Sequence, residues 1–140
     1  MWDDLAPGIT GAGPTATVQD PDGTPNNILD VTVGGSVVVD WSFQGVGIAL
    51  LDLAEFTVEL YADPVGPASN VLVGTAVVPG TITVPPTGPN PYTATIPIPA
   101  GFLAVGAYRL TTLITCSEGG FSAPIAGFVD GPIIQVRPGP

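Results

Sequence analysis

Carboxylates are the side chains of this sequence best suited to acid–base chemistry, because its 140 residues include 12 Asp and Glu, two Arg, and no His or Lys. Glu55 and Glu59 lie on one face of a segment in which polar and apolar residues alternate. On a strand this spacing separates them by about 13 Å, whereas the two carboxylates of a glycosidase lie about 5–9.5 Å apart. We therefore expect Glu55 and Glu59 to be solvated surface groups.

A second set of carboxylates, Asp20, Asp22 and Asp30, lies in and after a turn rich in Pro, Gly and Asn. Calcium prefers oxygen ligands of this kind, but a calcium loop ends with a bidentate glutamate at its twelfth position, which is Val31 here. Two interpretations stay open. The carboxylates stabilise the turn, or they form a weak calcium site.

The single cysteine, Cys116, follows the alternation of a strand and is predicted to face inward. The residues in phase with it are Tyr108, Leu110, Thr112 and Ile114. A reactive thiol needs a nearby cation, and only Arg109 is close in sequence. One cysteine forms no internal disulfide. We therefore expect Cys116 to be a buried thiol. Because the chain also lacks His and Lys, we expect no enzymatic activity and no cofactor.

Charge restricts the class of partner. Charged residues make up 10% of the chain and its net charge is −10. Nucleic acids and anionic membrane surfaces bind through Lys and Arg, so neither is an expected partner. No apolar run reaches the roughly 20 residues of a membrane-spanning helix, so no membrane insertion is expected. We expect a homo-oligomer or a protein partner.

Alternation of apolar and polar residues predicts the elements that position these groups. The clearest strand is residues 36–44, where Val37, Val39, Trp41 and Phe43 occupy one face. Its β-branched and aromatic residues agree with a strand in propensity as well as in period. Similar patterns predict strands in residues 15–19, 28–33, 55–61, 71–78, 92–98, 107–116 and 121–136. Seven to nine short strands separated by turns are typical of an all-β sandwich or barrel.

Two regions depart from this alternation. Residues 1–14 contain three glycines and two prolines and are predicted to form an irregular arm anchored by Trp2, before a single domain of residues 15–140. Residues 46–54 are apolar without strict alternation. They either cover one end of the sandwich or present an apolar patch to another subunit.

Two motifs resemble an immunoglobulin-like or fibronectin-like β-sandwich. Residues 31–41 are similar to a glycine bend that leads into strand B, with Trp41 at the position of the core cysteine. The Gly-Ala-Tyr-Arg-Leu segment around Tyr108 is similar to the tyrosine corner of strand F, with Leu110 at the second cysteine position. The resemblance implies that Phe56 takes the place of the strand C tryptophan. The resemblance implies an antiparallel sandwich without a core disulfide, used for binding or building.

The expected function is a non-catalytic subunit that self-associates in a filament, appendage, shell or phage-tail-like particle. An adjacent subunit would supply the surface that holds the N-terminal arm. The residues expected at this interface are Trp2, Leu5, Ile48, Leu50, Leu51 and Leu53.

The alternative function is a carbohydrate- or protein-binding module that acts through end loops or a sheet face. Tyr61, Tyr92 and Trp2 would serve as its stacking platforms. The compartment stays open, because a single cysteine fits a reducing cytosol as well as an exported subunit. A location outside the cell or on a particle surface is favoured, although the N-terminus lacks the cationic segment of a signal peptide.

Overall fold

The computed structural model describes residues 2–4, 9–45, 54–66, 69–82, 88–118 and 121–139. Within these residues the chain forms strands and no helix. The strands are β1 (Trp2–Asp4), β2 (Thr10–Gln19), β3 (Ile28–Asp30), β4 (Gly35–Gln44), β5 (Glu55–Pro64), β6 (Val71–Pro79), β7 (Asn90–Ile98), β8 (Gly106–Glu118) and β9 (Phe121–Arg137).

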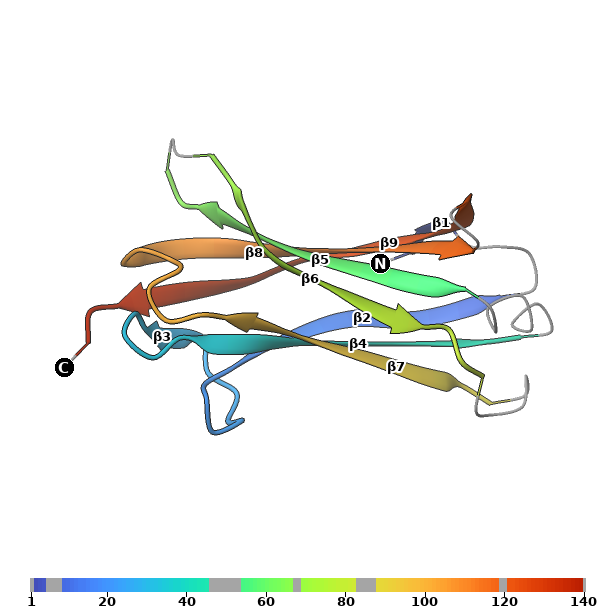
Figure 1. The fold of residues 1–140 in the computed structure, drawn as a ribbon, viewed down its shortest axis with the longest axis horizontal. Helices are drawn as coiled ribbons and strands as arrows, with labels where there is room; N and C mark the ends of the chain where they lie inside the picture. Colours follow the sequence, from blue (N-terminus) through green and yellow to red (C-terminus); the bar gives the residue numbers. More distant parts are fainter. Residues whose placement is uncertain are drawn as a thin grey trace.

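The strands form two sheets that lie face to face in a β-sandwich-like architecture (Figure 1). The smaller sheet has the order β2-β4-β7, and both of its pairs are antiparallel. The larger sheet has the order β1-β9-β8-β5-β6, also antiparallel. The short strand β3 pairs in parallel with the end of β9. Every element in the described part of the chain is therefore a strand, as expected for an all-β protein.

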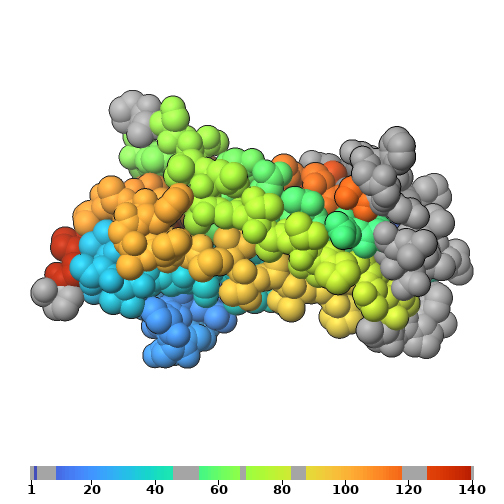
Figure 2. Space-filling model, in the orientation of Figure 1, coloured from blue at the N-terminus to red at the C-terminus, as the bar shows by residue number. Residues whose placement is uncertain are grey.

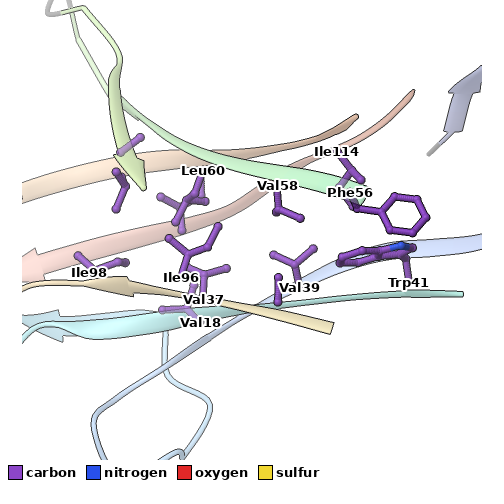
Figure 3. Packing of buried hydrophobic residues seen from close by; sticks show 14 of the residues in the cluster. Val18, Val37, Val39, Trp41, Phe56, Val58, Leu60, Ile96, Ile98 and Ile114 are labelled. Atoms are coloured by element: carbon purple, nitrogen blue, oxygen red, sulfur yellow. The ribbon is translucent and has the colours of Figure 1, made fainter. Parts of the chain in front are cut away.

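The core lies between the sheets and includes the residues that alternation assigned to one face of their strands (Figure 3). Strand β4 buries Val37, Val39, Trp41 and Phe43, and β5 buries every second residue from Phe56 to Ala62. Strands β7 and β8 bury Tyr92, Ala94, Ile96, Ile98, Tyr108, Leu110, Thr112, Ile114 and Cys116. The predicted phase is therefore confirmed for β4, β5 and β8.

Aromatic rings join the two sheets near the end of β4. The Trp41 ring meets Phe56 of the opposite sheet edge-on, with centroids 5.6 Å apart. Phe43 stacks on Phe56 at 5.6 Å, and Tyr92 of β7 lies 5.0 Å from the same ring. Such pairs contribute about 0.5–1.5 kcal/mol each beyond the area that they bury.

The N-terminal segment differs from the irregular arm that its glycines and prolines predict. Trp2–Asp4 forms β1 and pairs with β9, and Thr10–Gln19 is one strand along β4. The register of β2 shifts between Ala12 and Thr15, where Gly13 has a φ of +83°. Gly13 and Pro14 therefore mark a bulge within a strand and do not indicate that a strand is absent. Glycine and proline are both tolerated at bulges.

The corner before β8 is built as its sequence motif predicts. The Tyr108 hydroxyl donates a hydrogen bond to the carbonyl oxygen of Ala104 at 2.8 Å. The ring is buried, and in the loop before it Leu103 is buried while Phe102 and Val105 are exposed. Tyr108 therefore fixes the entry of the chain into the longest inward-facing run of the core.

Replacing Tyr108 by Phe is expected to lower the free energy of unfolding by about 0.5–1.5 kcal/mol, the net contribution of one such hydrogen bond. Urea denaturation followed by tryptophan fluorescence measures the change. Tyr61→Phe is the control, because the Tyr61 hydroxyl bonds to a half-buried glutamate on the outer face. An unchanged midpoint for Tyr108→Phe would contradict a structural role for this hydroxyl.

Thr112 is a polar exception in the core. Its side chain is fully buried, and its Oγ1 has no hydrogen-bond partner among the described residues. The next residue back, Thr111, is half-buried, and its hydroxyl donates to Asp130 at 3.2 Å. A buried hydroxyl without a partner carries a desolvation cost that an apolar group of the same shape avoids.

We therefore expect Thr112→Val to raise the free energy of unfolding by about 1–3 kcal/mol, the usual cost of an unsatisfied buried polar group. Thr111→Val, which loses a hydrogen bond, is expected to be neutral or destabilising. Thermal and urea unfolding of the two variants side by side test this difference. A destabilised Thr112→Val protein would mean that the Thr112 hydroxyl has a partner in solution.

Candidate functional site

The two glutamates of β5 lie on the outer face of the larger sheet. Glu55 is exposed and Glu59 is half-buried. The Tyr61 hydroxyl donates a hydrogen bond to Glu59 Oε2 at 2.8 Å, and this bond raises the pKa of Tyr61. Glu59 faces Thr75 on one neighbouring strand and Leu113 on the other. The carboxylate therefore has a hydroxyl partner and no second carboxylate directly across either strand.

Asp20 and Asp22 share one donor in the turn after β2. The Thr24 amide nitrogen lies 3.1 Å from Oδ1 of Asp20 and 2.9 Å from Oδ1 of Asp22. When Asp20 is protonated, its carboxyl group can hydrogen-bond to Asp22, which raises the pKa of Asp20 and lowers the pKa of Asp22 to about 2. Their oxygens are therefore engaged in closing the turn.

Asp30 occupies a different local structure at the end of β3. Its Oδ1 accepts hydrogen bonds from the Thr32 hydroxyl at 2.6 Å and from the Thr32 amide at 2.8 Å. The hydroxyl bond is the main cause of the lowered pKa of Asp30. No group of three His, Cys, Asp or Glu residues in the described ranges is arranged to hold a metal ion. The calcium interpretation of Asp20, Asp22 and Asp30 has no support from this geometry.

Cys116 is 2% exposed on the inner face of β8, as its position in the alternation predicts. Its register partner on β5 is Phe56, one of the aromatic residues that join the sheets. A buried thiol in apolar surroundings is inert towards reagents in solvent. The sequence prediction of a buried cysteine is confirmed.

Of the predicted interface residues, Trp2 lies within the described structure, and Leu5, Ile48, Leu50, Leu51 and Leu53 lie outside it. The Trp2 ring lies 4.7 Å from the Phe43 ring. It fills a slot between Gly11 and Gly127, where any side chain would collide with it. The surface that holds Trp2 in this structure therefore belongs to its own chain, and a contact of Trp2 with a neighbouring subunit stays a prediction.

The predicted stacking platforms are largely occupied. Tyr92 is 6% exposed, and its hydroxyl donates to the Gly80 carbonyl oxygen at 3.2 Å. Its place on the inward face of β7, with Ala94 and Ile96, outweighs the polarity of its hydroxyl, so the prediction that it is exposed is wrong. Tyr61 is half-buried and bonded to Glu59. These aromatic side chains do not form a shared platform for a sugar.

One flank of the molecule carries no charge. All 14 charged residues lie outside residues 64–108. This interval includes β6 and β7, which lie next to each other on the face drawn in Figure 2. Strands β6 and β7 come close to each other where the two sheets meet, and Gly74 of β6 lies against Ile96 of β7 there. On β6, Val77 is 58% exposed and Leu72 is 44% exposed. We call residues 71–82 and 90–98 the uncharged flank.

The sequence analysis did not identify this flank, because it began from side chains capable of acid–base, nucleophilic or metal-binding chemistry. Its signal in the sequence is a long interval between Asp63 and Arg109 without Asp, Glu, Lys or Arg. The overall charged fraction hides that interval because it averages over the chain.

None of the described segments forms a helix long and apolar enough to cross a membrane.

The hydrogen bond to Asp30 gives a test of the local geometry. Thr32→Val removes the hydroxyl donor, so the pKa of Asp30 is expected to rise towards its ordinary value of 3.8. A carboxyl whose pKa is lower in the folded state stabilises the fold above its unfolded pKa, and that stability is lost as the pH falls through the folded pKa. The variant is therefore expected to lose less stability between pH 4 and the folded pKa.

NMR titration of the Asp side-chain carboxyl carbons measures the pKa of Asp30 and the pKa of Asp22 directly. Thr24→Val is the matched control, because it is expected to raise the pKa of Asp22 from about 2 and to leave Asp30 unchanged. An Asp30 titration that is identical in Thr32→Val and in the original protein would contradict the assigned hydrogen bond.

No family model matches the chain, and no curated protein matches it. The functional inference therefore depends on the residues and the geometry described above.

Proposed function

We propose that this protein is a non-catalytic structural subunit that associates with copies of itself. The uncharged flank is the observation that carries this proposal. A chain with a net charge of −10 repels its copies wherever carboxylates face one another. The uncharged flank can be brought against another protein without placing a charge in a buried contact, which is costly unless the charge is paired.

Exposed apolar side chains on β6 support the same proposal. Val71, Leu72 and Val77 are each at least 39% exposed. Burying apolar surface yields about 25 cal/mol per Å², and contiguous exposed apolar patches mark interaction sites. The side chains that could carry out chemistry give less support for a function, because Cys116 is buried and the Asp carboxylates near the turn bond to local donors.

An immunoglobulin-like arrangement is part of the proposal. The order β2-β4-β7 corresponds to strands A, B and E, and the order β9-β8-β5-β6 corresponds to G, F, C and C′. The hydroxyl of Tyr108 bonds to the backbone four residues upstream, as in a tyrosine corner. Trp41 and Phe56 occupy the core in contact, where an antibody domain has a cysteine and the strand C tryptophan.

Sedimentation velocity across a hundredfold range of concentration tests the proposed function. We expect the chain of 14.1 kDa to form larger species as its concentration rises. A Leu50→Asp variant tests the predicted patch in residues 46–54 and is expected to form smaller species. A full chain that stays monomeric at the highest concentration would refute self-association. The carbohydrate- or protein-binding module would then be the better hypothesis, and a glycan array would examine it.

A further inference from the structure

Strand β6 forms a free edge of the larger sheet. Among the described strands, its hydrogen-bonded neighbour is β5 on one side. Its sequence, Val-Leu-Val-Gly-Thr-Ala-Val-Val-Pro, has no charged residue, and its proline is the last residue. Natural proteins protect exposed sheet edges with charges, prolines, bulges or a covering segment, because an unprotected edge pairs with another strand.

The other edges of the two sheets carry such protection. The short strands β1 and β3 cover parts of β9 on the side away from β8. Strand β2 changes register next to Pro14, and β7 contains Pro91 and Pro97. Because proline has no N–H to donate, it interrupts a new ladder. By this comparison β6 is the edge of the described structure most open to pairing.

A bulge divides β6 and defines the part that is able to pair. Val73 has no partner in β5, because Leu60 pairs with Gly74 and Tyr61 pairs with Leu72. Residues 74–79 then pair with β5 without interruption. Gly74 packs so closely on Ile96 that a Cβ added to Gly74 would lie 2.8 Å from the Cγ2 atom of Ile96. The edge after the bulge is therefore regular and held in position, which lowers the entropy cost of binding.

Charge identifies a second copy of this chain as the occupant of the edge. A basic partner would be drawn to carboxylates, and the uncharged flank has none. Pairing of β6 with β6 would keep Glu59 of one copy and Glu59 of the other three strand spacings apart, about 14 Å. Charges at that distance are largely screened at physiological salt, where the Debye length is about 8 Å. Packing the outer faces of two larger sheets together would instead bury both glutamates.

We propose that residues 74–78 of β6 pair antiparallel with the same residues of a second copy, which extends the larger sheet across a two-fold axis. Ala76 lies at the centre of this run, so Thr75 of each copy faces Val77 of the other. Both side chains are exposed on the outer face of the sheet. The inference rests on the proposed function, because it names the contact through which the subunits associate.

Paired lysine substitutions test the contact. In the Thr75→Lys/Val77→Lys variant each lysine faces a lysine of the other copy, and like charges directly opposite are destabilising. We expect self-association to weaken at least tenfold by sedimentation. The control is Ile133→Lys/Gln135→Lys, which adds the same charge at the same spacing on exposed positions of β9, a strand that pairs with β8 along one side and, from Gln135 onward, with β3 on the other. The control is expected to associate like the original chain, and thermal unfolding verifies that both variants fold.

Disulfide trapping tests the register. Chains carrying Thr75→Cys, mixed under oxidising conditions with chains carrying Val77→Cys, are expected to yield more linked dimers than either variant alone. Cys116 is 2% exposed and does not compete. Equal yields in all three samples, or a Thr75→Lys/Val77→Lys variant that associates as strongly as the control, would overturn the β6 contact. Failure of the original chain to associate would instead refute the proposed function, so the two failures are distinguishable.

Discussion

The contact between Trp41 and Phe56 across the two sheets is the interaction on which the rest of the structure depends. Each sheet has one apolar face, and neither is stable in water unless the other covers it. The edge-on packing of these rings, with Phe43 and Tyr92 around them, fixes the distance and alignment of the layers at one end. The buried alternating residues of β4, β5 and β8 continue that contact along the sandwich-like core, and the outer faces and edges that remain are the surfaces available for function.

Much of this core could be predicted from the sequence, because alternation is a local property. The inward residues of β4, such as Val37 and Val39, follow directly from a period of two. Strand pairing is not local in the same way. Nothing in residues 28–30 indicates that they pair in parallel with residues 135–137, more than 100 residues away. The glycines and prolines of the N-terminal segment suggested irregular backbone, but a neighbouring strand supplies hydrogen bonds that hold such residues in a bulged strand.

The candidate functional surface was harder to predict than the core. A search for chemistry begins with Asp, Glu, Cys and aromatic residues, and those residues are engaged within the fold, as Asp22 and Tyr92 are. The uncharged flank is defined by residues that are missing. Its significance depends on β6 lying at a sheet edge beside β7, which only the tertiary structure establishes. Low overall charge suggested association, but composition alone does not locate the face involved.

The pairing of β9 with β1 and β3 has a consequence for the order in which the protein becomes native. A ribosome releases the chain from its N-terminus, so residues 2–4 and 28–30 emerge long before residues 121–137, their partner strand. Until then Trp2 lacks the Gly127 side of its slot, and the end of the larger sheet is unfinished. Completion of this fold therefore waits until residues 121–137 have emerged, and until then the nascent chain exposes an indole and two short unpaired strands to chaperones.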